Sequence, residues 1–329
     1  MYKKMRYFIL LSIIFLLSCG EDNKQIQIGL LLHKLEGTAW EKDARIFKEK
    51  AHNAGAKIII KNANGNEVLQ NEQAIELINK GVDVLIITAV NTNNAAAIVR
   101  KAKRNNIKVI AYRRNIKNSN IDCFAGFDSK KAGSLQANYI KNNFPDKANI
   151  IILEGDRNDE NAEIISLQHD YELKQKVKNG SYKIVYKTFI ENWSKTDAYF
   201  EFAKAFQFCN EKIDAVLCAN DALATGVSKY LEQIGLSGKV LLTGMDAHLT
   251  ACQRIINNQQ GMTLYKPIDK LIDQIMRLVV SKSYENNDKK QILIDPVFVS
   301  KENIDKVIID NRVYSKKELY SSGIQNSSY

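Results

Sequence analysis

The side chains that could catalyse a reaction are scattered along this chain. No GxGxxG follows the first predicted strand and GxxxxGK[ST] is absent, so the phosphate cradle of a nucleotide-binding enzyme is missing. No Ser stands between two glycines in the spacing of a hydrolase nucleophile elbow. The four histidines, His33, His52, His169 and His248, are isolated from one another. We therefore expect a protein that is not an enzyme and that uses no cofactor.

The cysteines give no metal site either. Besides Cys19, the chain contains Cys123, Cys209, Cys218 and Cys252, without a CxxC pair and without a His at metal-ligand spacing. Cys123 and Cys218 lie in strand patterns, where a thiol is usually a small core residue. In an exported protein one pair could oxidise, and the sequence does not decide whether a disulfide forms.

Short β-rich runs alternate with helical segments from Gln27 onward, which indicates βαβ units and a parallel sheet. The first predicted strand is 27–32. The helix after it carries apolar residues at spacings of three and four, which predicts one buried stripe ended by Gly55. The stripe is Trp40, Ala44, Phe47, Ala51 and Ala54.

The alternation continues, restarts after Asp128, and so predicts two α/β lobes. The further predicted strands are 57–61, 84–87, 108–111, 149–153, 182–188, 215–218 and 239–243. The further predicted helices are 66–80, 93–105, 129–143, one from about 161, 195–208, 221–234 and 249–258. Ligands of parallel sheets bind at the carboxyl ends of strands, so the loops after Leu32, Ala111, Leu153, Thr188, Cys218 and Thr243 are the candidate binding loops. His33 and His248 lie in two of them.

The first residues read as an export signal. Lys3, Lys4 and Arg6 precede the apolar run 8–17, which is too short to span a bilayer comfortably. The run ends at Ser18-Cys19, which resembles a bacterial lipoprotein signal. We expect residues 1–18 to be removed, Cys19 to be lipidated, and 19–26 to form a tether that holds the protein in the periplasm or on the outer face of the cytoplasmic membrane. An ordinary signal with a coincidental Cys is the alternative.

The chain is basic, with 47 Lys and Arg against 37 Asp and Glu and a formal net charge of +10. Such an excess can indicate nucleic acid, anionic lipid or an acidic partner. Here the basic residues are spread along amphipathic helices, with no Arg-rich block and no interleaved aromatic run. We interpret them as solvated helix faces and expect no nucleic-acid partner.

Short motifs along the chain carry a family resemblance. They are 62–67 (NANGNE), 78–85 (INKGVDVL), 127–128 (FD), 135–137 (LQA), 236–240 (LSGKV), 265–268 (YKPI), and a tail running from 303 to 319. In this order and spacing they resemble the D-xylose-binding proteins of type 1 periplasmic ABC transport systems, from about Ile28 to Leu319.

The resemblance implies an α/β fold of the type 1 periplasmic binding proteins, with two doubly wound parallel-sheet lobes joined by a three-strand hinge. Lobe 1 would be 27–127 plus 264–296, lobe 2 would be 128–263 plus 297–319, and 320–329 would be a tail. The lobe crossings are expected near Phe127, Thr263 and Pro296.

The resemblance also implies the ligand-binding residues. Those that match the family's positions are Arg114, Asn161, Trp193, Asn220, Asp246 and Lys266. An indole ring buries the apolar C–H face of a sugar, while amides and carboxylates suit its hydroxyls. Arg113, His33 and Trp40 are further candidates. Asn220 could instead only cap the next helix, and Trp193 could be surface packing.

Two positions depart from the family. The family has Tyr-Asp-Arg after its fourth strand, where this chain has Tyr112-Arg113-Arg114, and its first-loop Arg is here Ala39. One interpretation is that Arg113 fills the space left at Ala39 and the same sugar binds. The other is a changed specificity, in which Arg113, Arg114 and Lys266 bind an acidic or different monosaccharide.

The function implied is that of the substrate-binding lipoprotein of a sugar ABC transporter. A monosaccharide would close the hinge by contacting both lobes, and a permease in the inner membrane would receive it. The alternative is a sensor that docks on a membrane histidine kinase or a chemoreceptor. We expect a monomer. The sequence does not identify the sugar or its affinity.

Overall fold

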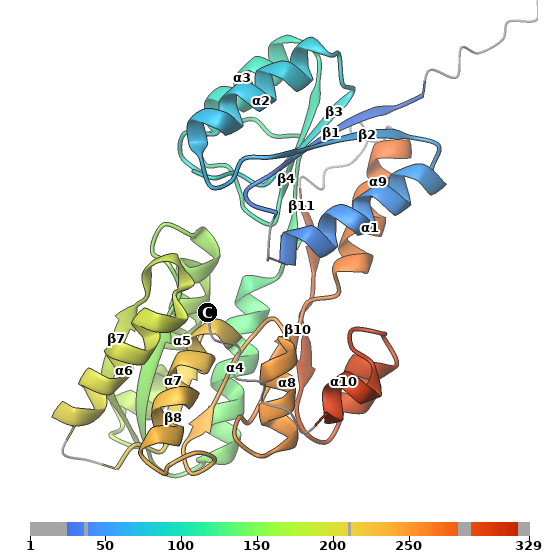
Figure 1. Cartoon of the computed structure of the whole chain (residues 1–329). Helices are drawn as coiled ribbons and strands as arrows, with labels where there is room; N and C mark the ends of the chain where they lie inside the picture. Colours follow the sequence, from blue (N-terminus) through green and yellow to red (C-terminus); the bar gives the residue numbers. More distant parts are fainter. Residues whose placement is uncertain (1–24, 36–38, 210–211, 282–290, 322–329) are drawn as a thin grey trace, which may run out of the picture.

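The computed structural model describes residues 25–35, 39–209, 212–281 and 291–321. They form two α/β lobes, one above the other in Figure 1. The predicted export signal and Cys19 lie outside the described residues. Within the described ranges, no helix is both long enough and apolar enough to cross a membrane.

Lobe 1 contains a six-stranded parallel sheet with the strand order β11-β5-β4-β3-β1-β2. The strands are β1 (Gln27–Leu32), β2 (Lys57–Asn62), β3 (Val84–Ile87), β4 (Lys108–Tyr112), β5 (Cys123–Phe127) and β11 (Gln291–Ile294). Its helices are α1 (Ala39–Asn53), α2 (Glu67–Asn79), α3 (Ala96–Arg104) and α9 (Ile268–Ser281).

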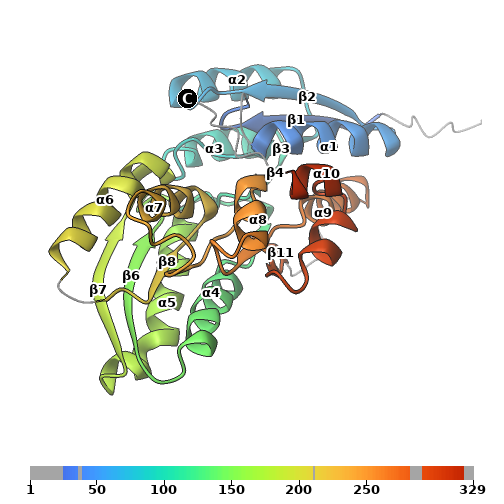
Figure 2. The ribbon, with the colours of Figure 1, turned by 60° about the horizontal axis from the view of Figure 1, so that its bottom comes forward.

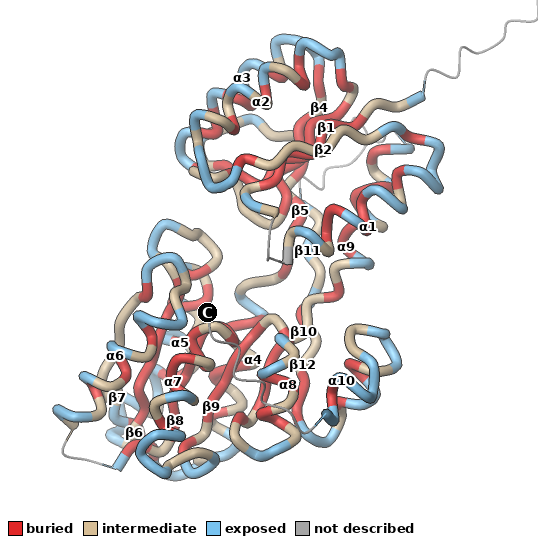
Figure 3. Tube along the Cα trace, viewed as in Figure 1, coloured by how far each residue is buried: buried red, intermediate tan, exposed pale blue. Residues whose placement is uncertain are grey.

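Both faces of this sheet are covered, because successive side chains of a strand point to opposite faces. Ile28 and Leu30 of β1 pack in one core cluster with residues of α1 and α9, whereas Leu31 packs in another with residues of α2 and α3. The strands are accordingly buried while the outer helix faces are exposed (Figure 3). The lobe 1 sheet is therefore covered by helices on both faces.

Lobe 2 contains a four-stranded parallel sheet with the order β7-β6-β8-β9. The strands are β6 (Ala148–Glu154), β7 (Tyr182–Phe189), β8 (Ala215–Cys218) and β9 (Leu241–Leu242). The helices are α4 (Ser129–Asn143), α5 (Glu160–Lys178), α6 (Lys195–Phe208), α7 (Asp221–Gln233), α8 (Leu249–Ile256) and α10 (Lys316–Tyr320), with short turns η1 (Glu191–Trp193) and η2 (Asp305–Ile309).

The alternation of side chains along a strand also explains why helices cover both faces of the lobe 2 sheet. Ile150 and Ile152 of β6 pack with residues of α4 and α5, and Ile151 and Leu153 pack with residues of α6 and α7. Figure 2 shows the two helix pairs on either side of the strands. Ala137 and Leu173 on one face and Phe202 on the other are almost fully buried.

The chain passes between the lobes at three neighbouring places. β5 leads into α4 at Asp128, β10 (Thr263–Tyr265) leads into α9 through Lys266, and β11 leads into β12 (Val297–Val299) through Pro296. β10 and β12 pair antiparallel in a small sheet beside lobe 2. The predicted α/β fold with two parallel sheets and a hinge of three connections is confirmed.

Three predicted details of the elements are wrong. Ala54 is exposed rather than part of the buried stripe, because α1 ends at Asn53 and Gly55, at φ +67°, turns the chain. α3 begins at Ala96 instead of residue 93, because the Asn91 side chain accepts hydrogen bonds from the backbone of Asn93 and Asn94 and holds a turn there. β9 is limited to Leu241 and Leu242, the two residues that pair with β8.

Candidate functional site

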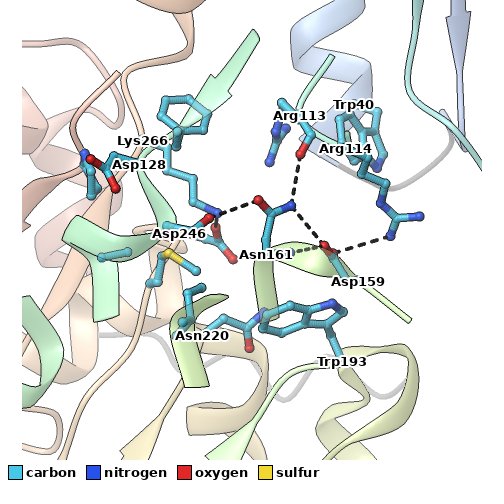
Figure 4. A pocket seen from close by; sticks show the side chains of 16 residues that line it. Trp40, Arg113, Arg114, Asp128, Asp159, Asn161, Trp193, Asn220, Asp246 and Lys266 are labelled. Atoms are coloured by element: carbon cyan, nitrogen blue, oxygen red, sulfur yellow. Dashed lines mark hydrogen bonds and ion pairs between the residues drawn. The ribbon is translucent and has the colours of Figure 1, made fainter. Parts of the chain in front are cut away.

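A cavity of about 190 Å³ lies between the strand ends of the two lobes. Every predicted ligand residue except His33 lines it: Trp40, Arg113, Arg114, Asn161, Trp193, Asn220, Asp246 and Lys266. These residues come from elements far apart in the sequence, and Figure 4 shows them converging on one space. Phe127, Asp128, Lys266 and Pro296, at the lobe crossings, form part of its wall. A molecule in this cavity would touch both lobes and the hinge.

Arg113 forms the lobe 1 wall through a buried carboxylate. Its guanidinium lies 4.2 Å from the ring centroid of Trp40, and its Nη1 donates to Asp43 Oδ2 at 2.8 Å. The Tyr112 hydroxyl donates to the same oxygen at 2.8 Å, and Asp43 is 1% exposed. Arg113 has φ +60°, the left-handed region, which turns the chain directly after β4. The guanidinium is thus fixed before any ligand arrives.

Asp43 is a residue that sequence reasoning missed. It stands three residues after Trp40 and four before Phe47, so it lies on the buried face of α1. A carboxylate on the buried face of an amphipathic helix needs a partner. The position of Asp43 on that face could therefore have identified it from the sequence. Its Oδ1 has no hydrogen-bond partner among the described residues. The charge of Asp43 and burial together raise the pKa of Tyr112 well above its ordinary value, with burial the larger cause.

Asn161 joins the two lobes across the cavity. Its Nδ2 donates to the Arg113 carbonyl at 3.1 Å and to Asp159 Oδ1 at 2.9 Å, and its Oδ1 accepts from Ser129 Oγ at 3.0 Å. Asp159 is the N-cap of α5, accepts from the backbone of Asn161, and lies 4.0 Å from Arg114 Nη2. Figure 4 shows this group lying between the two lobes. Asp159 and Ser129 were not predicted; both precede or begin a helix at a strand-end loop, where polar N-caps are common.

Trp193 lies against Gly155, which follows β6. A Cβ on Gly155 would be 2.2 Å from Cη2 of the indole, so only glycine leaves room for the ring. Asn192 and Trp193 both have φ +53°, and this tight turn places the indole on the cavity. Trp193 is therefore part of the cavity wall rather than isolated surface packing.

Asn220 has two uses in the structure. Its Oδ1 accepts from the Leu223 backbone at 3.0 Å and caps α7, as the sequence allowed. Its amide nitrogen has no hydrogen-bond partner among the described residues, and Asn220 also lines the cavity. Helix capping therefore orients the amide and leaves its donors for a ligand.

Asp246 and Lys266 face each other at the hinge. Lys266 Nζ lies 2.7 Å from Asp246 Oδ1. Burial raises the pKa of Asp246, but Lys266 and other nearby positive charges outweigh that effect, and the net pKa is lowered. Asp246 and Ala247 have φ +108° and +50°, strained values for residues with side chains. Thr263 Oγ1 accepts from the Ala247 backbone and donates to the buried Asp221, which stabilises this turn.

Each cation of the cavity wall has a carboxylate beside it. Arg113 pairs with Asp43, Lys266 pairs with Asp246, and Arg114 lies within 4.0 Å of Asp159. Asp128 adds a further carboxylate, which caps α4 through the Lys131 backbone. The wall therefore offers oriented donors and acceptors and two indole rings without a net positive charge.

His33 lies outside the lining of the cavity, in the loop after β1. It is half-buried, and burial, followed by the charges of Arg114 and Lys34, lowers its pKa to about 4. In the part of the chain that the structure describes, no disulfide joins Cys123, Cys209, Cys218 and Cys252.

Comparisons with known proteins agree with this architecture. Residues 28–284 match the model of the periplasmic binding protein domain family. The chain is 33% identical over 329 residues, covering 96% of it and 99% of the relative, to the D-xylose-binding periplasmic protein of Haemophilus influenzae. It is 35% identical to the D-xylose-binding periplasmic protein of Escherichia coli, covering 90% and 93%.

A solved structure shows the same fold. The solute-binding protein of an ABC transporter from Clostridium phytofermentans, with bound β-D-glucose, has a TM-score of 0.80 to this chain at 24% identity, covering 89% of this chain and 99% of that one.

Proposed function

Because the chain belongs to the periplasmic binding protein family, we propose that it binds one neutral, xylose-like monosaccharide between its lobes and delivers it to the permease of an ABC transporter. The observation that carries the proposal is the cavity in which Trp193 faces amides, carboxylates and cations from both lobes. Similarity to two D-xylose-binding periplasmic proteins over almost the whole chain supports the sugar class.

The ion pairs favour a neutral sugar over a sugar acid. Arg113, which replaces the family's Asp, does not carry a free positive charge into the cavity, because Asp43 accepts its hydrogen bond at 2.8 Å. Lys266 is similarly paired with Asp246 at 2.7 Å. A ligand carboxylate would meet Asp159 and Asp246 as well as the paired cations, so the wall would offer it no net attraction. The guanidinium remains a donor for a hydroxyl or ring oxygen.

Hinge closure is the mechanism that the contacts support. Asn161 of lobe 2 already reaches the Arg113 carbonyl of lobe 1. A sugar that hydrogen-bonds residues of both lobes would bind the closed form better than the open form, and that difference in affinity would drive closure. The permease would then recognise the closed form.

Anchoring through a lipidated Cys19 belongs to the same proposal. The apolar run 8–17 and Ser18-Cys19 support it. Mass spectrometry of the mature protein from membranes tests it: an acylated Cys19 at the N-terminus is expected, and an unmodified N-terminus elsewhere would contradict it.

Calorimetric titration tests the sugar. We expect D-xylose to bind, D-ribose and D-galactose to bind more weakly, and D-xylonate not to bind. Trp193→Ala should abolish the binding, because the indole supplies the apolar wall. Tight D-xylonate binding would overturn the neutral-sugar proposal, and unchanged D-xylose affinity in Trp193→Ala would show that the site is elsewhere.

A further inference from the structure

A buried series of polar side chains connects β6 and α5 to two binding loops. Glu154, His169 and Gln136 each have an exposed fraction of 0%. Gln136 Nε2 lies 3.1 Å from the Cys218 carbonyl, 3.2 Å from the Ala219 carbonyl and 3.0 Å from the Gly244 carbonyl. The Ala219 and Gly244 carbonyls directly precede Asn220 and Met245, which line the cavity.

The three carbonyls determine where the hydrogens are. A carbonyl only accepts, so the Gln136 amide must turn its NH₂ toward them and its oxygen toward His169. His169 Nε2, 3.1 Å from that oxygen, must therefore carry a hydrogen. His169 Nδ1 lies 3.1 and 3.2 Å from the two Glu154 oxygens and faces another acceptor. Nε2 therefore supplies the hydrogen that Gln136 accepts, while Nδ1 faces the Glu154 carboxylate.

The groups around Glu154 favour its ionised state. Lys187 Nζ lies 3.4 Å from Glu154 Oε1 and also pairs with Asp170, the residue after His169. Burial raises the pKa of Glu154, but the charge and hydrogen bond of His169 outweigh it, and the net pKa is lowered. Lobe 2 therefore encloses an ionised Glu154 beside His169, and neither residue lines the cavity.

We propose that His169 is a positioning residue for ligand binding, acting through Gln136. Gln136 ties the end of β8 to the loop after β9, and His169 holds the Gln136 amide in the only orientation that can do so. Asn220 and Asp246 are thereby kept at the separation that lets one ligand reach both. This inference rests on the proposed sugar-binding function of the cavity.

A pair of variants isolates the hydrogen bond from the buried charge. In Glu154→Gln, a neutral His169 keeps its Nε2 hydrogen for Gln136 and accepts at Nδ1 from the new amide. In the double variant, Glu154→Gln with His169→Leu, the Nε2 donor of residue 169 is lost. No unpaired carboxylate remains, because residue 154 is then a glutamine. Calorimetry with D-xylose should give a dissociation constant within about twofold of the natural protein for the first variant and about tenfold weaker for the second, as one lost buried hydrogen bond would cause. His52→Leu, on the exposed side of α1, is the control.

Two NMR readouts do not depend on the sugar. The ¹⁵N spectrum of His169 should show a hydrogen on Nε2. The backbone amide shifts of Asn220 and Met245 should move in the double variant and stay in Glu154→Gln. A ring without a hydrogen on Nε2, or equal affinities and equal amide shifts in the two variants, would overturn the inference. If the natural protein binds no D-xylose, the proposed function fails, and the amide shifts alone decide this inference.

Discussion

Arg113 and Asp43 stand 70 residues apart in the sequence and are joined by a 2.8 Å hydrogen bond at the wall of the interlobe cavity. The guanidinium, held between this carboxylate and the Trp40 ring, is a donor whose charge is compensated. An always-charged residue in the cavity wall is thus compatible with a neutral ligand.

Removing the charge of Asp43 should change the class of ligand. We predict that Asp43→Asn weakens D-xylose binding about tenfold, because Arg113 loses an ionic partner and its orientation. The same variant should bind D-xylonate measurably, since the cavity gains one positive charge. Calorimetry with both ligands measures this. Equal D-xylose affinity in the variant would show that Asp43 does not hold Arg113 for the ligand.

Adding a methyl group at Gly155 should displace the stacking ring. The new Cβ would lie 2.2 Å from Trp193 Cη2, so the indole must move, and we predict about a tenfold or greater loss of D-xylose affinity and a change in tryptophan fluorescence. Gly133→Ala is the matched control. Its Cβ would lie 2.9 Å from Gln168 Cβ, so it should lower the melting temperature and leave the affinity unchanged.

Thr263 should support the strained turn at Asp246. Thr263→Val removes the hydroxyl that accepts from the Ala247 backbone and donates to Asp221, and leaves the buried Asp221 with fewer donors. We predict a loss of about 1–3 kcal/mol in the free energy of unfolding and weaker sugar binding, measured by urea unfolding and calorimetry. Thr243→Val, which loses one bond to the Cys218 carbonyl, should lower stability less. Equal effects of the two substitutions on binding would contradict this role.

His33 should make the protein less stable in mild acid. Its pKa is lowered from 6.5 to about 4 by burial and by Arg114, so between these values the unfolded chain binds a proton that the folded chain does not. The stabilising contribution is therefore present above pH 6.5 and disappears as the pH falls toward 4. His33→Gln should flatten the fall in the unfolding free energy between pH 6.5 and 4.5, measured by urea unfolding. His52→Gln, at an exposed position, should retain the slope of the natural protein.

Local sequence patterns predict the elements better than they predict contacts between them. The strands 27–32, 84–87 and 215–218 and the helix 195–208 have the predicted bounds, because continuous apolar runs and polar caps define them. The two-residue β9 was predicted too long, because the pairing of its neighbour β8 sets its length.

The strand-end rule placed the cavity correctly, because parallel strands bring all their following loops to one edge. It did not reveal Asp43, which lies inside a helix, or the Asn161 contact with the Arg113 carbonyl. Such partners depend on how elements that are distant in the sequence pack together, and no local periodicity encodes that packing. The ligand roles of the lining residues stay predictions.

The pairing of the cavity cations with carboxylates also predicts how ligand capture depends on the salt concentration. A binding site with unpaired lysines and arginines attracts anions over long distances, and dissolved salt screens that attraction. Here Arg113 and Lys266 direct their charge into carboxylates a hydrogen bond away. A neutral ligand entering such a cavity gains short contacts that mobile ions cannot reach. Capture of the ligand should therefore be nearly independent of ionic strength, so that the protein works equally well in dilute and in saline surroundings.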